Sequence, residues 1–148
     1  MAAVTSWRPG WDAFPQALLD FWTERHLCTL TTLRADGLPH VVPVGVALDP
    51  DERCAWVITN RSSQKVRNLK HSQRVAACQV DGRHWSTLEG RAQLCTDEGS
   101  VRRAEERYAT RYRTPKPNPE RVAIRIDVDR FLVSAAFAQP VDRSSASD

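Results

Sequence analysis

Hydrophobic positions along the chain follow two periods, one helical and one extended, and turn residues separate them. From Trp11 to Arg25, apolar side chains recur every three or four residues, which predicts an amphipathic helix with Pro15 in its first turn. Six other runs are rich in β-branched and apolar residues and predict strands. They cover residues 27–33, 40–48, 54–59, 74–80, 84–95 and 122–133.

The connections between these runs carry signals of their own. Asp36-Gly37 and Asp81-Gly82 are residue pairs that favour tight hairpin turns. Residues 113–120 include three prolines, which predict a stiff extended crossing rather than a helix or a central strand. Within the second strand, Pro43 and Gly45 predict an unpaired stretch or a bulge, where the edge of a ligand could pair.

Two more helices are predicted, after strands three and five. Val66 and Leu69 give residues 63–71 one apolar helical stripe. After the fifth strand, residues 96–98 place acids in a first helical turn, and the helix that follows turns an apolar face inward. Tyr108 and Tyr112 are expected to pack this helix against the rest of the fold, and Tyr112 is the one that could line a groove.

This order of elements predicts an α+β fold, namely a six-stranded antiparallel split β-barrel with an N-terminal helix and helices after strands three and five. A closed barrel of this size fills its interior with side chains, so a large ligand is expected outside it, in a groove completed by a second copy. Residues 11–138 are expected to form this single domain. Residues 1–10 are expected to be a flexible arm and residues 139–148 a disordered tail.

The composition is that of a globular protein. The 148 residues are 41% hydrophobic and 26% charged, and no apolar run approaches the roughly 18 residues of a membrane helix. The N-terminus lacks a basic start followed by an apolar stretch, so a cytoplasmic location is expected by default. Cys28, Cys54, Cys78 and Cys95 lie far apart, without C-x-x-C spacing or a nearby histidine pair, which predicts free thiols and no metal site.

The net charge of +3 comes almost entirely from arginine, since only Lys65, Lys70 and Lys116 are lysines. Such a balance suits an anionic ligand. It is too mild and too dispersed to predict nucleic-acid binding, for which a basic face with exposed aromatic residues would be expected.

The transition from the third strand to the following helix combines the residue types of a phosphate site. Asn60, Ser62 and Ser63 are residues that cap helix starts, where unpaired N–H groups attract anions. Arg61 and Lys65 would add positive charge. An ordinary capped helix with solvated basic residues explains the same pattern about equally well, so the residues alone leave both interpretations open.

Three motifs carry a resemblance to a known family: LRADGLPHVVPV at 33–44, ITNRSSQK at 58–65 and WSTLEGR at 85–91. In order and spacing they resemble the split β-barrel flavin-binding superfamily related to pyridoxamine 5'-phosphate oxidase, across residues 16–135. Three further motifs, ERHL at 24–27, QVDG at 79–82 and RYRTPKPNP at 111–119, are similar to the branch that uses the deazaflavin coenzyme F420. Within that branch they resemble the F420-dependent biliverdin reductases of actinobacteria.

The resemblance implies an oxidoreductase that passes a hydride from reduced F420 to a conjugated acceptor such as biliverdin, with the cofactor groove at the interface of a homodimer. Because the cofactor carries out the hydride transfer, the protein mainly has to position the cofactor and the acceptor and needs few acidic groups. The sequence agrees, because it shows no Ser/His/Asp set, no carboxylates paired in an apolar setting and no metal-ligand spacing.

The resemblance also implies site residues. The cofactor ring would lie along the second strand and its phosphate in the predicted cradle. From the residue type alone, Trp85 could stack on the ligand, and packing in the core or at a dimer interface explains it equally well. The candidate cofactor-binding residues are Val42, Pro43, Val44, Gly45, Thr59, Asn60, Arg61, Ser62, Ser63, Gln64, Lys65 and Trp85. Candidates for orienting the propionates of the acceptor are Arg34, Arg113 and Lys116, and an ordinary solvated loop charge is the alternative interpretation of each.

One departure from the superfamily pattern bears on the cofactor. FMN-dependent members usually carry an arginine in the second strand that grips the FMN phosphate, whereas this chain has Val41-Val42-Pro43-Val44 there. F420 is therefore expected, with FMN as the alternative cofactor. An FMN-dependent oxidase of the same fold and a non-catalytic flavin-binding or haem-related protein are the alternative functions.

Overall fold

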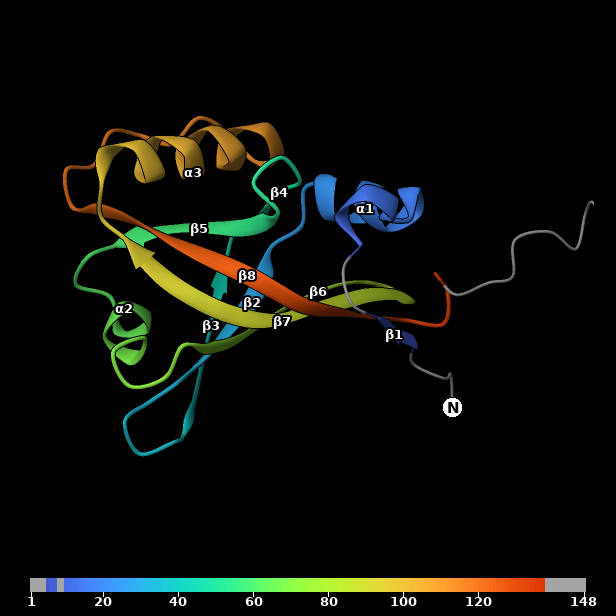
Figure 1. The fold of residues 1–148 in the computed structure, drawn as a ribbon, viewed down its shortest axis with the longest axis horizontal. Helices are drawn as coiled ribbons and strands as arrows, with labels where there is room; N and C mark the ends of the chain where they lie inside the picture. The colour runs from blue at the N-terminus through green and yellow to red at the C-terminus, as the bar shows by residue number, and fades with distance from the viewer. Residues whose placement is uncertain (1–4, 8–9, 138–148) are drawn as a thin grey trace, which may run out of the picture.

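The computed structural model describes residues 5–7 and 10–137 (Figure 1). Its elements in chain order are β1 (Thr5–Trp7), a 3-10 helix (Trp11–Ala13), α1 (Gln16–Thr23), β2 (Cys28–Leu33), β3 (Pro39–Val44), β4 (Ala47–Asp49), β5 (Cys54–Asn60), α2 (Gln64–Asn68), β6 (Arg74–Asp81), β7 (His84–Cys95), α3 (Glu98–Arg111) and β8 (Arg121–Val133). The arm expected over 1–10 thus contains strand β1. Residues 1–4 and 8–9 of that arm, and the tail expected over 139–148, lie outside the described residues.

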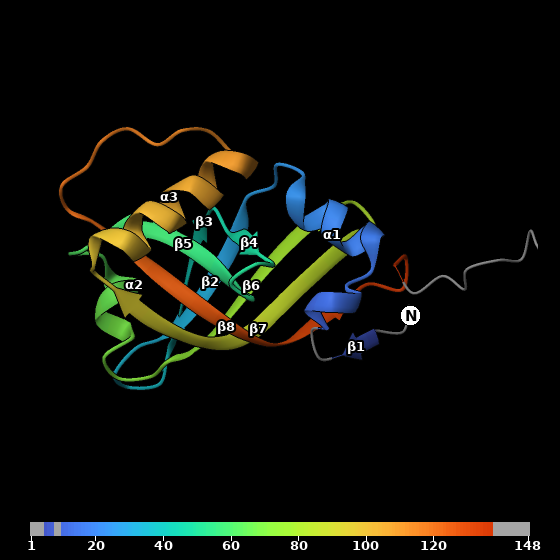
Figure 2. The same cartoon turned by 45° about the horizontal axis from the view of Figure 1, so that its top comes forward.

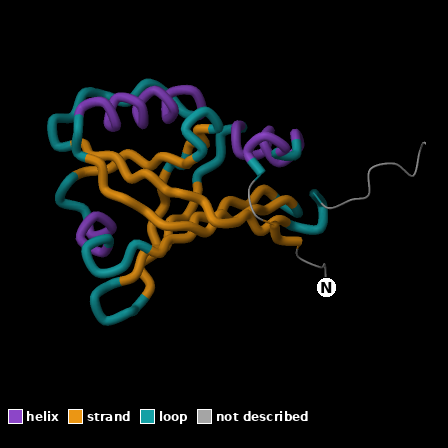
Figure 3. The backbone as a smooth tube through the Cα atoms, viewed as in Figure 1, coloured by secondary structure: helices purple, strands orange, loops and turns teal. Residues whose placement is uncertain are grey.

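All strands belong to one antiparallel sheet in the order β3-β2-β6-β7-β8-β5-β4, and β1 adds to it by pairing with β8. Figure 2 shows how strongly this sheet curves. In Figure 3, α3 and α1 lie along one side of the strands, while α2 lies near the β2–β3 hairpin. The predicted α+β class is confirmed.

The predicted count of six strands and the closure of the barrel are wrong. Within residues 5–7 and 10–137, no pairing joins β3 to β4 or β5, so the sheet stays open. The predicted strand over 40–48 breaks at Gly45 and Val46 into β3, which pairs with β2, and β4, which pairs with β5. The irregularity expected at Pro43 and Gly45 is therefore a complete break that sends the chain to the opposite end of the sheet.

The predicted N-terminal helix is also interrupted. Pro15 forces the preceding residue out of helical geometry, and Phe14 accordingly has ψ 125°. A 3-10 turn precedes the break, and α1 begins only at Gln16. Trp11 and Phe14 stack with ring centroids 5.9 Å apart, and both meet the ring of Phe131 edge-on. This segment covers one end of the core, as its apolar spacing predicts.

One fully buried carboxylate, that of Asp49, ties β4 to β5 and α3. Its oxygens accept hydrogen bonds from Trp56 Nε1 at 2.9 Å, from Arg103 Nε at 2.8 Å and from Arg103 Nη2 at 2.7 Å. Burial alone would raise the pKa of Asp49, but the bonds from Arg103 and Trp56 outweigh it and hold the pKa below its ordinary value. The ionised carboxylate therefore contributes to stability at neutral pH.

Replacing Asp49→Asn should lower the free energy of unfolding, because Arg103 loses its charged partner. Removing one partner of a buried pair costs roughly 3–5 kcal/mol; we expect about 2 kcal/mol, since the Arg103 side chain is 33% exposed. Urea unfolding at pH 7 measures this loss. Asp51→Asn is the matched control, because Asp51 pairs with the same arginine at 3.6 Å but is 88% exposed.

The same variant should change the response to acid. The pKa of Asp49 is lower in the folded protein than in the unfolded chain. The stabilisation by its carboxylate is therefore complete above about pH 4, the ordinary carboxyl range, and is lost as the pH falls through the folded-state pKa. Asp49→Asn should accordingly lose less stability than the unsubstituted chain between about pH 5 and pH 2. Equal acid sensitivity of the two proteins would contradict this assignment.

Candidate functional site

A groove of about 460 Å³ lies where the sheet fails to close. We call it the split groove. One lip is formed by residues 43–45 at the end of β3, and the other by residues 58–60 at the end of β5 together with Lys65. Tyr108 of α3 and residues 113–116, 118 and 121 complete the lining.

Two prolines on the open edge of β3 keep another strand from pairing there and filling the groove. Pro39 and Pro43 stand opposite Leu33 and Thr29 of β2. Because proline has no N–H, both prolines must occupy non-hydrogen-bonded pairs, so the backbone groups of Pro39, Val41 and Pro43 point to the open edge. That edge then offers a single N–H, from Val41, and it resists pairing with a further strand.

Tyr108 of α3 and Tyr112, the residue that follows α3, clamp the β3 lip. The rings of Tyr108 and Tyr112 stack with centroids 4.9 Å apart. A Cβ atom on Gly45 would lie 2.8 Å from Tyr108 Cε2 and 2.9 Å from Tyr112 Cε2, so only glycine fits this contact. The Tyr112 hydroxyl donates to the His26 carbonyl at 2.6 Å and accepts from the Val46 N–H at 3.1 Å.

The structure reverses the roles expected for these two side chains. Tyr108 lines the split groove, whereas Tyr112 packs below it. Burial raises the pKa of Tyr112, which keeps its hydroxyl protonated as a donor. The i, i+4 spacing indicates that the two rings share one helix face, but it does not say which of them reaches the groove.

The guanidinium of Arg111, at the end of α3, is buried next to this clamp. It donates to the carbonyl oxygens of Glu24 at 2.9 Å and Val46 at 2.5 Å, and to Gln79 Oε1 at 2.5 Å. Its carbon Cζ lies 5.5 Å from the ring centroid of Trp22. Within the described part of the chain no carboxylate lies within 4 Å of it, so backbone and amide oxygens, with the Cys28 sulfur and the Trp22 and Tyr112 rings, replace the water around this charge.

The proline-rich loop is fastened to the β5 lip. Asn118 Nδ2 donates to Asn60 Oδ1 at 2.6 Å, and the Arg61 N–H donates to the Glu120 carbonyl at 2.9 Å. Both ends of the loop are therefore held, at α3 and at β5, and its three prolines stiffen the part between them. This arrangement gives the groove a firm third wall.

Three cations of the split groove are free of acid partners. Among the described residues, Lys65, Arg113 and Lys116 have no carboxylate within 4 Å, while Arg121 at the groove end pairs with Glu105 at 2.6 Å. Partial burial lowers the pKa of Lys65. Uncompensated charges of one sign in one hollow favour an anionic ligand.

Eight of the predicted site residues meet in this groove: Pro43, Val44, Gly45, Thr59, Asn60, Lys65, Arg113 and Lys116. The others do not line it. Arg61 pairs with Glu120 at 3.7 Å, and Gln64 is engaged by Asn68 and Arg67. Ser63 accepts the Thr59 hydroxyl at 3.3 Å.

The remaining predicted residues lie elsewhere in the chain. Val42 packs against the core, the Ser62 carbonyl accepts from Arg67 Nη1, and Arg34 belongs to the β2–β3 turn. Trp85 stands opposite Val80 on β6. The helix predicted over 63–71 spans only Gln64–Asn68, and Ser63 makes no side-chain capping bond. A single turn has little dipole, so the attraction for an anion rests on the charged side chains.

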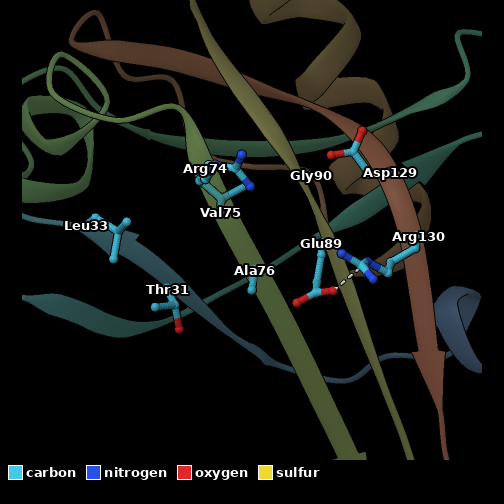
Figure 4. A pocket seen from close by; sticks show the side chains of 9 residues that line it. All are labelled: Thr31, Leu33, Arg74, Val75, Ala76, Glu89, Gly90, Asp129 and Arg130. Atoms are coloured by element: carbon cyan, nitrogen blue, oxygen red, sulfur yellow. Dashed lines mark ion pairs between the residues drawn. The ribbon is translucent and has the colours of Figure 1, made fainter. Parts of the chain in front are cut away.

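A second hollow, of about 230 Å³, lies on the outer face of the sheet and contains none of the predicted site residues (Figure 4). Its lining is Thr31, Leu33, Arg74, Val75, Ala76, Glu89, Gly90, Asp129 and Arg130. Arg130 Nε and Glu89 Oε1 form an ion pair at 2.9 Å within it. Charges of both signs make this hollow a poorer anion site than the split groove.

Two negative findings concern the described residues alone. None of their helices is long and apolar enough to cross a membrane. No group of three or more histidine, cysteine or acidic side chains among them is placed to hold a metal ion.

Comparisons with known proteins point in one direction. Residues 14–134 match the family described as pyridoxamine 5'-phosphate oxidase. The F420H(2)-dependent biliverdin reductase of Mycobacterium tuberculosis (strain CDC 1551 / Oshkosh) is 54% identical over 117 residues, which are 79% of this chain and 85% of that protein.

Solved structures share the fold. A conserved hypothetical protein from Mycobacterium tuberculosis superposes with a TM-score of 0.70 at 23% identity, covering 94% of this chain and 99% of its own. A protein described as an F420 reductase gives 0.65 at 22% identity, covering 79% and 97%. At these identities the likeness concerns the fold alone.

Gly45→Ala should test the clamp. The added methyl group must displace two stacked rings, which costs about 1–3 kcal/mol in a packed site, so we expect a lower midpoint of thermal unfolding. Gly99→Ala is the control, because its Cβ would meet nothing closer than Asp97 Oδ2 at 3.6 Å. That change should be neutral or stabilise α3 by up to about 1 kcal/mol. Equal effects of the two substitutions would contradict the close contact at Gly45.

Proposed function

Because the chain belongs to the pyridoxamine 5'-phosphate oxidase family, we propose that it is an F420-dependent reductase that reduces a conjugated acceptor, biliverdin. The observation that carries this proposal is a groove in which three cations have no carboxylate partner among the described residues, in a chain 54% identical to an F420H(2)-dependent biliverdin reductase. Both molecules that such an enzyme binds are polyanions, since F420 has a phosphate and a glutamyl tail and biliverdin has two propionates.

The residues present fit the deazaflavin better than FMN. The β3 lip of the split groove, Pro43–Val44–Gly45, has no cation to grip an FMN phosphate. The positive charges stand instead at Lys65 on the other lip and along the proline-rich loop, spread as an extended anionic tail requires. The unpaired edge of β3 leaves room for a flat ring beside residues 43–45, which line the groove.

When bound, the reduced deazaflavin supplies a hydride from its C5 to an electron-poor carbon. Lys65, Thr59 and Asn60 would hold its phosphate, and residues 43–45 would orient the ring. Arg113 and Lys116 would bind the carboxylates from the third wall of the groove. Arg34 does not line the groove of its own chain and has no part in this proposal.

Fluorescence titration with F420 and, separately, with FMN tests the cofactor. We expect saturable quenching of F420 fluorescence and no binding of FMN in the same concentration range. Addition of biliverdin to the protein with reduced F420 should then bleach the biliverdin absorption band. Tight binding of FMN alone would move the function to an FMN-dependent oxidase, and F420 binding without turnover would favour a binding protein.

Lys65→Ala should weaken F420 binding roughly 10- to 150-fold, the range expected for losing a hydrogen bond to a charged group. Folding should be little affected, since Lys65 is a half-buried residue at the wall of the groove and forms no ion pair with any described residue. Lys70→Ala is the matched control, as an exposed lysine nearby that lies outside the groove. An unchanged dissociation constant for Lys65→Ala would remove it from the phosphate site.

A homodimer is part of the proposal, and the outer face of the sheet supports it. Cross-strand neighbours there form a row without charge from β3 to β8, namely Pro43, Thr29, Cys78, Thr87 and Leu132. In the next row Val80, 66% exposed, stands beside Trp85. An uncharged strip across several strands, beside the charged residues of the second hollow, is compatible with an interface. Trp85 would reach a split groove only across it, from a second copy.

Val80→Glu should therefore shift the protein from dimer to monomer in analytical ultracentrifugation, because a carboxylate buried at the interface would lose its hydration. Arg102→Glu, an exposed change of charge on α3, is the control and should leave the mass unchanged. A monomeric unsubstituted protein, or a dimeric Val80→Glu variant, would place the interface elsewhere or exclude it.

A further inference from the structure

Tyr108 differs from every other side chain of the split groove. It is a neutral proton donor whose ring is fixed, by the stack on Tyr112 and by the contact with Gly45. Within residues 5–7 and 10–137 its hydroxyl has no hydrogen-bond partner, whereas the Tyr112 hydroxyl is bound on both sides. A rigid phenol without an intramolecular partner, at the wall of a ligand groove, has its hydroxyl available to a ligand.

We propose that Tyr108 is the catalytic proton donor, which passes its Oη proton to a nitrogen of the bound acceptor. The assignment rests on the proposed function. Reduction of a conjugated tetrapyrrole by two electrons forms one C–H bond from hydride and one N–H bond from a proton. The electron pair displaced along the conjugated chain is received by nitrogen, the O–H bond of Tyr108 breaks, and the phenolate regains a proton from solvent.

The four cations of the groove and Thr59 are less suited to this step. The guanidinium groups of Arg113 and Arg121 do not release protons in proteins. Lys65 and Lys116 would lose their hold on an anion if they gave up a proton. The Thr59 hydroxyl is already engaged by Ser63. A phenol is protonated at neutral pH and yields its proton far more readily than a guanidinium.

The position of Tyr108 also suits the chemistry. Its ring touches Gly45, on the lip beside which the reacting ring of the cofactor is proposed to lie. The cations Arg113 and Lys116 stand on the adjoining wall, where they can hold the propionates of the acceptor. An acceptor anchored there and stacked toward β3 would bring its central nitrogens to the Tyr108 side of the groove.

Tyr108→Phe keeps the stacked ring and removes only the hydroxyl. We expect an unchanged midpoint of thermal unfolding and an unchanged dissociation constant for F420, with kcat lowered about 100-fold or more, as for loss of a general acid. The solvent deuterium isotope effect on kcat should be present in the unsubstituted protein and altered in the variant. Biliverdin binding to cofactor-free protein, followed by absorption, should weaken about 2- to 10-fold through the lost hydrogen bond.

Tyr112→Phe is the matched control, because its hydroxyl bonds to His26 and Val46 and not to the groove. It should lower the unfolding midpoint and retain the isotope effect of the unsubstituted protein. A kcat of Tyr108→Phe within threefold of the unsubstituted value would overturn the proposal. Failure of the unsubstituted protein to bind F420 is a different result, which would overturn the proposed function itself.

Discussion

The buried guanidinium of Arg111 is the point at which α1, the β3–β4 break, β6 and α3 meet. A buried charge without a counter-ion is costly unless oxygen atoms replace its water. Here the carbonyls of Phe21, Glu24 and Val46 and the amide of Gln79 do so, with distances from 2.5 to 3.4 Å. Because these acceptors come from three parts of the chain, the end of α1, the β3–β4 break and β6, the hydrogen bonds of this one guanidinium fix several elements relative to one another.

The position of the split groove follows from that constraint. Arg111 holds the Val46 carbonyl, and Tyr112, the next residue, holds the Val46 N–H. The residue before Val46 is Gly45, pressed against both tyrosines. The lip of the groove is thus set from within the core, while prolines 39 and 43 keep its outer edge unpaired. The contacts at Gly45 and Val46 thus both end β3, which leaves the barrel open, and hold the lip of the groove in place.

The sequence predicts most of the fold, because strand alternation and turn residues are local signals. Gly37 and Gly82 have φ of 84° and 59°, as the two Asp-Gly turns require. The prediction of one strand over residues 40–48 is wrong, because a continuous apolar run does not show that its two halves pair with opposite ends of the sheet. The N-terminal periodicity likewise passes through Pro15, where the backbone cannot follow it.

The site is harder to predict because it depends on the direction of side chains. Residues 61–64 sit in a suitable motif, yet Arg61 and Gln64 are held by neighbouring groups outside the groove. The sequence does not predict that Tyr108 lines the groove, because helical spacing places it on the same face as Tyr112. The two residues are one helical turn apart, and tertiary packing decides which ring lies at the groove. Residue type and spacing predict which region of the chain forms the groove, while tertiary contacts determine which of its side chains line it.

The amino-acid composition likewise indicates the charge of the ligand but not the residues that bind it. The excess of arginine suggests an anionic ligand, yet many arginines are structural: Arg103 pairs with Asp49, Arg121 with Glu105 and Arg130 with Glu89. Planar guanidinium groups suit such fixed, directional pairs. Of only three lysines in the chain, Lys65 and Lys116 line the split groove. A lysine ammonium on a flexible side chain can adjust its position to a bound phosphate or carboxylate. The positions of the few lysines therefore indicate the anion-binding site better than those of the many arginines.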